Sequence, residues 1–202
     1  MPMVDRRRVP IEIRAEENGR LTGYLLRWEE LSTGLRWFRE RFRRGAFAES
    51  LANRAHDVVA LWSHDATKPL ASRDAGTLEI AEDEIGPAFS FTPAATSWGR
   101  DAVEAIRSGL VRAMSFGFEA VDADWELKDG EEIRTVTRAD LYEISPVIFP
   151  AYDSGSVESR SVEEVWKQHL AEAGAARGGE TRQGHVDVLL AINQSRVRSL
   201  SR

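Results

Sequence analysis

The chain has 202 residues, of which 42% are apolar and 30% are charged, and its formal net charge is -6. It contains no cysteine, which excludes a cysteine nucleophile, a disulfide framework, Cys-ligated zinc and iron–sulfur clusters. No stretch approaches the roughly 18–20 apolar residues that a membrane span needs, and no apolar segment of a secretion signal follows the basic N-terminus. These features predict a soluble intracellular protein with one domain and an appendage.

Charge is distributed unevenly along the chain. Residues 1–44 carry 11 basic against 7 acidic residues, a net of +4, whereas 45–152 carry 9 against 19, a net of -10. Residues 153–202 are neutral, with 7 of each. One basic run is a candidate nucleic-acid patch, although interleaved aromatic residues also fit arginines on the wet face of a strand. Its members are Arg36, Arg39, Arg41, Arg43 and Arg44.

The first half of the chain predicts short strands joined by turns. Residues 9–14 and 20–28 indicate a hairpin, because Asn18-Gly19 between them tolerates positive φ. Three elements follow: a strand over 35–43, a helix over 45–51 and a continuous apolar run over 58–62, which is typical of a buried strand.

The second half predicts further strands and one helix. Ser97 is a good cap for a helix that runs to Ser108 and is closed by Gly109. The predicted strands are 77–80, 86–93, 112–121, 132–137 and 140–148, with a polar turn at 128–130. Roughly eight short strands with two interposed helices indicate an α+β fold, namely a mixed β-barrel or sandwich with flanking helices.

The chain changes character after residue 152, which separates a domain over 1–152 from a mobile, partly helical C-terminal tail over 153–202. An amphipathic stripe predicts a helix over 161–173, a Gly-rich linker covers 174–184 and a second possible helix spans 186–200. Such helices need something to pack against, and we expect a partner protein rather than the barrel itself. The stripe consists of Val162, Val165, Trp166 and Leu170.

The histidines limit where a general base can lie. A hydrolase of this composition with covalent catalysis needs a Ser, Thr, Lys or carboxylate nucleophile, and histidine is the simplest base. His169 and His185 fall on the tail, and His56 has no distinctive neighbours. His64 directly follows the apolar run 58–62, so a rigid element holds it at the edge of the core; a structural histidine is the alternative interpretation.

Ser115 and Glu143 are the other candidate site residues. In the segment AMSFGFE (113–119) the period of two places three large apolar side chains on one face, and Ser115 with Gly117 on the other. Glu143 interrupts an apolar strand, so its charge needs a partner: an arginine, or the imidazole of His64. Asp65 is a competing partner for His64, and Ser145 is a competing nucleophile.

Metal and phosphate sites find no support in the sequence. The carboxylates at 82–84 and 122–126 lie in polar turns without the spacing of a calcium loop, and no Gly-rich phosphate loop is present. We therefore expect no metal and no cofactor.

Several segments, taken in order, resemble the prohead maturation proteases of tailed phages with the HK97-type capsid. The resemblance covers roughly residues 19–152, and gene transfer agents encode related proteases. The segments are GAF (45–47), LWSHD (61–65), FSF (89–91), MSFGF (114–118), LYEISPV (141–147) and PAY (150–152).

The resemblance implies a herpesvirus-assemblin-like β-barrel and a serine endopeptidase. The family's serine falls on Ser115, its histidine on His64 and its acidic residue on Glu143. Phe116 and Gly117 would lie at the substrate. The oxyanion donors are not placed by the resemblance, and backbone N–H groups near Gly117 or Arg112 are candidates.

The implied substrates are the scaffolding or delta segment of the major capsid protein and the protease itself, inside the procapsid in the bacterial cytoplasm. An extended substrate strand would pair with an edge of the barrel, and the tail from Ser154 would be a targeting segment that is removed by self-cleavage. The sequence leaves open whether the protein forms a homo-oligomer. Neither nucleic acid nor a membrane is an expected partner.

Two other functions fit parts of the sequence. A non-catalytic scaffold or capsid-binding module would keep the barrel and tail without needing His64, Ser115 and Glu143. A nucleic-acid-binding protein would use the arginine run, but the net charge of -10 over 45–152 argues against it.

Overall fold

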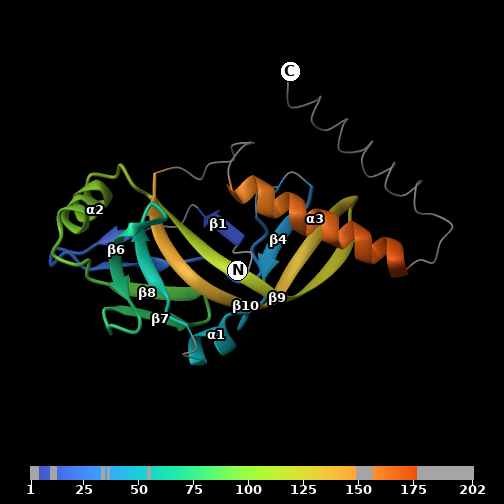
Figure 1. Ribbon diagram of the computed structural model, residues 1–202, viewed down its shortest axis with the longest axis horizontal. Coiled ribbons are helices and arrows are strands. Elements are labelled where there is room, and N and C mark those ends of the chain that lie inside the picture. Colours follow the sequence, from blue (N-terminus) through green and yellow to red (C-terminus); the bar gives the residue numbers. More distant parts are fainter. Residues whose placement is uncertain are drawn as a thin grey trace, which may run out of the picture.

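The computed structural model describes residues 5–9, 13–32, 35, 37–53, 56–148 and 157–176. This part of the chain is a mixed α+β structure, mostly strands, with three helices. Its strands form two sheets, and the long curved hairpin of β9 and β10 runs through the middle of the molecule (Figure 1).

The large sheet contains six strands in the order β1-β9-β10-β5-β6, with β4 pairing on β10. Most neighbours are antiparallel, but β4 and β5 run parallel to β10. Its strands are β1 (Asp5–Val9), β4 (Arg39–Phe42), β5 (Val59–Trp62), β6 (Asp65–Ser72), β9 (Ala113–Lys128) and β10 (Glu131–Val147).

The small sheet contains four strands in the antiparallel order β2-β3-β8-β7. Its first hairpin uses the predicted turn, where Gly19 has a φ of 84°. The strands are β2 (Arg14–Ala15), β3 (Leu21–Tyr24), β7 (Leu78–Glu82) and β8 (Pro87–Phe91).

The main core lies where the apolar faces of the two sheets meet. Met114, Phe116 and Phe118 of β9 are fully buried there, in the same cluster as Phe89 and Phe91 of β8. The predicted alternation of β9 is therefore confirmed over this segment. Helix α2 (Ser97–Arg107) covers the same cluster with Ala102 and Ile106, and α1 (Ala48–Ala52) is a single short turn beside it.

The predicted closed barrel is not found among the described strands, because no strand pairing joins the two sheets. Residues 25–28 were predicted as the end of a strand, but β3 ends at Tyr24, and the segment 25–32 instead makes single backbone hydrogen bonds to both sheets. Leu25 N–H donates to Pro87 of the small sheet, and Glu29 N–H donates to Phe42 of the large sheet. This irregular segment links the sheets where a barrel would need regular pairing.

Two features of the large sheet differ from the predicted elements. The three strands expected over 112–148 are one long hairpin, with the polar turn confirmed at Asp129 and Gly130 and register shifts that bend it. β6 was not predicted, since its sequence DATKPLAS has weak strand propensity. Pro69 is tolerated there because β6 is an edge strand.

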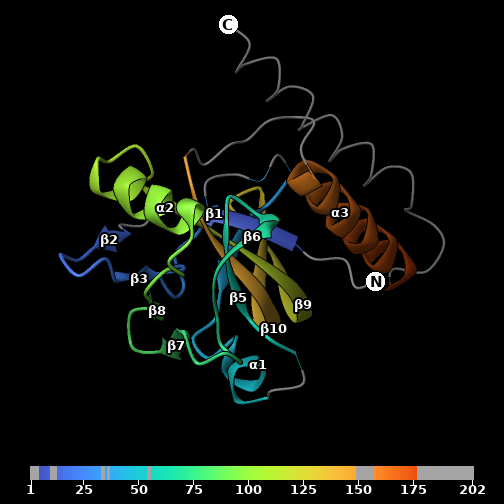
Figure 2. The same ribbon diagram turned by 60° about the vertical axis from the view of Figure 1, so that its left-hand side comes forward.

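Helix α3 (Val157–Ala176) packs on the protein itself. The predicted stripe residues Val162, Val165 and Trp166 are buried against Leu35 and Phe38, with Trp125 of β9 beside them. Figure 2 shows α3 alongside β1, with which it is in contact. The stripe is thus covered by the chain's own surface rather than left for a partner. The linker was predicted over 174–184, but α3 continues through residues 174–176; the rest of the linker and the second expected helix lie outside the described residues.

Three arginines of the candidate basic run lie against carboxylates, namely Arg39 and Arg41 of β4 and Arg43 directly after it; Arg36 lies outside the described residues. Arg41 contacts Glu126 at 3.0 Å, and Arg43 contacts Asp124 at 3.0 Å. Arg39 lies 3.8 Å from Glu131. Asp124 and Glu126 lie on β9 and Glu131 lies on β10, close to the turn at 128–130 that joins these two strands. The charges of the three arginines are therefore neutralised by carboxylates of the β9–β10 hairpin.

A buried ion cluster ties three strands of the large sheet together. Glu40 of β4 is 2% exposed and receives Arg7 Nε of β1 at 2.5 Å and Arg134 Nη1 of β10 at 2.9 Å. Burial by itself would raise the pKa of Glu40, but the charges of Arg7 and Arg134 outweigh it and lower that pKa. The charged carboxylate therefore contributes stability above its ordinary pKa and loses it as the pH falls through the lowered value.

We expect E40Q to lower the free energy of unfolding at pH 7 by about 3–5 kcal/mol, because it leaves two buried guanidiniums without their carboxylate. Urea titrations of the variant and the parent measure this difference, which should shrink as the pH falls below 4.5, the ordinary pKa of a glutamate. E79Q is the control, since the pair of Glu79 with Arg20 is exposed and is worth less than about 1 kcal/mol. Equal effects of E40Q and E79Q would contradict the expectation.

Candidate active site

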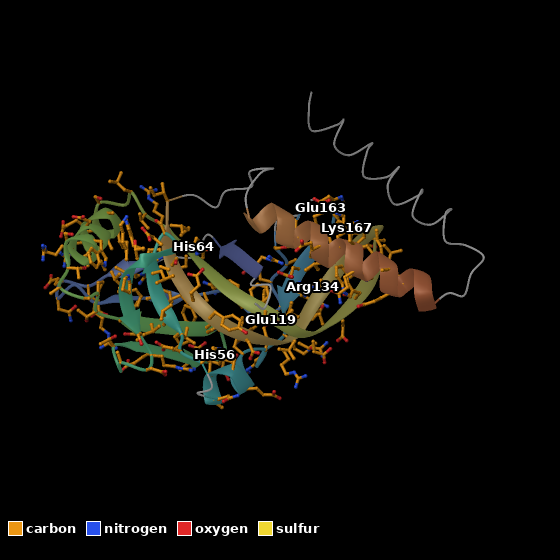
Figure 3. The ribbon with its side chains drawn as sticks, in the orientation of Figure 1. His56, His64, Glu119, Arg134, Glu163 and Lys167 are labelled. Carbon is orange, nitrogen blue, oxygen red and sulfur yellow. The ribbon has the colours of Figure 1, made fainter. Side chains whose placement is uncertain are left out.

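His64 lies in a tight turn between two strands of the large sheet. Trp62 of β5 pairs with Asp65 of β6, which leaves Ser63 and His64 as the two turn residues. Both have positive φ, 53° and 63°, as in a type I′ hairpin turn. The turn follows the predicted buried strand, and Figure 3 labels His64 on the α2 side of the molecule, with Arg134 of the ion cluster on the α3 side.

The imidazole of His64 is bonded to Glu143. Of the two partners predicted for this carboxylate, an arginine or His64, the histidine is therefore in contact with it. His64 Nδ1 and Glu143 Oε1 are 2.5 Å apart, and the Glu143 residue is 6% exposed. Glu143 reaches this position because β10 pairs with β5, the strand that leads into the His64 turn.

Asp65, the competing partner, makes its side-chain contacts with Thr67 and Lys68 rather than with the imidazole. Its Oδ1 accepts hydrogen bonds from the hydroxyl and the backbone N–H of Thr67, and its Oδ2 lies 3.0 Å from Lys68 Nζ. The hydrogen bonds from Thr67 and Lys68 lower the pKa of Asp65 to about 2. Both carboxylate oxygens of Asp65 are therefore engaged by residues of its own strand, β6.

Ser115 lies on β9 directly opposite Ser145 of β10, on the same face as Gly117 and Glu143, which also oppose each other. It is 0% exposed. Within the described part of the chain, Ser115 Oγ and His64 Nε2 are both buried and have no hydrogen-bond partner. Unpaired buried polar atoms are uncommon in folded proteins, so their presence on two of the candidate site residues is consistent with a functional role.

Ser145 has a different environment from Ser115. Its Oγ donates to Glu143 Oε2 at 2.7 Å and accepts the backbone N–H of His64 at 3.2 Å. From the sequence, Ser145 is predicted only as a second possible nucleophile. The signal for its actual contact was the period of two along β10, which places Glu143 and Ser145 on one face.

The two residues predicted to meet the substrate have different positions. Gly117 is buried on the site face and pairs with Glu143 and with Arg6 of β1. The ring of Phe116 points into the core, where it contacts Phe42 and Phe47. Only the backbone of Phe116 is therefore near the site face, and oxyanion donors near Gly117 or Arg112 stay a prediction.

The other histidines have structural contacts. His56 Nε2 lies 3.1 Å from the carbonyl oxygen of Leu141, and its ring packs on Tyr142. His169 on α3 stacks on Trp125, with ring centroids 3.8 Å apart. His185 lies outside the described residues. In the part of the chain described above, no group of three or more His, Asp or Glu side chains is arranged to hold a metal ion.

A comparison with protein-family models places these observations in context. The model described as Caudovirus prohead serine protease matches residues 9–168. The chain belongs to this family. The role of this family is proteolysis in capsid maturation.

The family match also covers residues 157–168 of α3, which the resemblance over 19–152 does not include. Comparisons with curated proteins and with solved structures give no match. No helix in the described ranges is long and apolar enough to cross a membrane.

Proposed function

We propose that Ser115 is the nucleophile of this prohead protease, His64 its general base and Glu143 the carboxylate that orients His64. The observation that carries the proposal is the bond between His64 Nδ1 and Glu143 Oε1, which leaves Nε2 as the ring nitrogen without a partner among the described residues. That nitrogen is the atom that a serine hydroxyl needs as proton acceptor, and Ser115 Oγ is the unpaired hydroxyl of the same site.

The reaction follows from these roles. His64 Nε2 takes the proton of Ser115 Oγ while the oxygen attacks the carbonyl carbon of the scissile peptide bond. His64 then gives the proton to the leaving amine as the C–N bond breaks, and an acyl-enzyme is formed. Water, deprotonated by His64, hydrolyses the ester and restores Ser115. Glu143 keeps the imidazole in one tautomer and stabilises its positive charge.

The substrates that we propose are the scaffolding or delta segment of the major capsid protein and the protease itself, inside the procapsid. Family membership supports a capsid protein as substrate, because these enzymes act in capsid maturation. We also propose that residues 1–152 form the protease domain and that the region from 153 onward carries targeting and self-cleavage sites.

Co-expression with the cognate capsid protein, followed by intact mass spectrometry, tests this function. We expect the capsid protein to lose one defined segment and the protease to be shortened in the region from residue 153 onward. Particles that assemble with full-length capsid protein in the presence of the protease would contradict the proposal. They would favour a non-catalytic capsid-binding module instead.

Labelling with a fluorophosphonate, which reacts with activated serines, identifies the nucleophile independently of the substrate. We expect a single adduct whose peptide contains Ser115. The S115A variant is the control, because the adduct should disappear in it. An adduct on Ser145 would exchange the roles of the two serines.

A further inference from the structure

The geometry points to Ser145 as a positioning residue that fixes both Glu143 and the His64 turn in the orientation needed for proton transfer. This inference rests on the proposed roles of Ser115, His64 and Glu143. It assigns to Ser145 a part in the reaction other than nucleophilic attack.

One hydroxyl group connects the two partners at a second point. His64 and Glu143 already meet through Nδ1 and Oε1, and Ser145 Oγ joins the remaining carboxylate oxygen, Oε2, to the backbone N–H of His64. Ser145 is 0% exposed, so no solvent competes for these hydrogen bonds. The imidazole, the carboxylate and the turn backbone thus form a closed ring of contacts.

The hydrogen bonds of Ser145 restrict two motions that the bond between His64 and Glu143 leaves free: rotation of the Glu143 carboxylate and movement of the His64 turn. The terminal torsion of a glutamate is broad, so one bond to Oε1 does not fix the plane of the carboxylate. A hydrogen bond to each oxygen does fix it. On the other side, the N–H of His64 belongs to a turn residue with positive φ, and its hydrogen bond to Ser145 holds that turn against β10.

These contacts also argue against Ser145 as the nucleophile. Its proton is donated to a carboxylate, and its oxygen accepts the His64 backbone N–H. The nitrogen that must accept a nucleophile's proton is His64 Nε2, whereas the hydroxyl proton of Ser145 is directed to Glu143 Oε2. Because the hydroxyl of Ser145 is bonded to Glu143, the carboxylate that orients His64, it is suited to positioning the base rather than to attacking the substrate.

Steady-state kinetics of S145A test the role on a peptide that spans the mapped cleavage site. We expect kcat to fall about 10- to 100-fold, the effect of losing a hydrogen bond to a charged group, with KM changed less than about twofold. S72A is the matched control, since Ser72 Oγ also donates to a carboxylate, Asp57, and accepts a backbone N–H, that of Ala75. It should keep the parental kcat.

A double-mutant cycle separates positioning from general stability. Because Ser145 acts through Glu143, adding S145A to E143Q should change kcat less than about twofold. A parental kcat in S145A, or an equal loss in both backgrounds, would overturn the inference. If the parent shows no cleavage that depends on Ser115, the proposed function fails instead.

Proton NMR of the resting protein gives a readout that needs no turnover. The Nδ1–H of His64, held against Glu143, should give a sharp downfield signal in the parent and in S72A. In S145A that signal should broaden or shift. An unchanged signal in S145A would overturn the positioning role whatever the activity measurements show.

Discussion

Replacing Ser115 with alanine is expected to abolish processing of the capsid protein, with a loss in kcat of about 10⁴- to 10⁶-fold. The variant lacks the oxygen that forms the acyl-enzyme, and alanine offers no substitute. Mass spectrometry of the capsid protein after co-expression, with purified protease and peptide for the residual rate, measures the loss. Processing at the parental rate would refute the assignment of Ser115.

S115A should fold at least as well as the parent, which makes its inactivity interpretable. Ser115 Oγ is buried and has no hydrogen-bond partner among the described residues, so its removal breaks no hydrogen bond and relieves a polar atom that burial disfavours. We expect an unchanged or slightly higher Tm. S145A completes the comparison, because it removes the facing hydroxyl and should retain measurable activity.

The second large effect is expected for E143Q, with a loss in kcat of about 10⁴-fold, as when a triad acid is replaced by its amide. Glu143 uses one oxygen for His64 and the other for Ser145, whereas glutamine has only one oxygen. Where the amide NH2 faces Nδ1, it donates a hydrogen bond to that nitrogen and forces the imidazole proton onto Nε2. His64 then cannot accept the proton of Ser115.

D65N is the control for E143Q, because Asp65 follows His64 in sequence but binds Thr67 and Lys68 instead. Asparagine keeps the Oδ1 that accepts from Thr67, so the hairpin should remain and cleavage should stay near the parental rate. Loss of activity in D65N with retention in E143Q would reverse the assignment of the orienting acid. Both are measured with the same peptide assay.

Local patterns predicted the elements that carry the site. The alternation of large and small residues at 113–119 placed Ser115 on the face opposite the core, and the carboxylate within the apolar strand 140–148 required a partner. That partner is His64, as the structure shows. These predictions succeeded because period-two alternation and the need to pair a buried charge act over a few residues.

Features set by distant contacts could not be predicted in this way. The Asp-rich half of β9 has low strand propensity and is a strand because it pairs with β10 and because Trp125 packs under α3. The apolar stripe on α3 indicated that the helix packs against another apolar surface, but it did not indicate that this surface is formed by Leu35 and Phe38 of the same chain. Likewise, the hydroxyl of Ser145 acquires its role only when the His64 turn is brought to β10.

The position of β1 has a consequence for how a substrate reaches Ser115. At that residue β9 pairs with Arg8 of β1 on one side and with Ser145 of β10 on the other, so both backbone edges are occupied. A polypeptide that adds as a strand beside Ser115 has to replace β1, since β10 carries Glu143.

This replacement is a competition between a tethered strand and an incoming one. A segment of the same chain on a short tether acts at an effective concentration on the order of millimolar. A free peptide at micromolar concentration is outcompeted by such a strand, whereas segments packed at high density on the inner wall of a particle are not. For a substrate that adds as a strand at this edge, occupation by β1 would therefore favour cleavage at high local concentration over cleavage of dilute peptide.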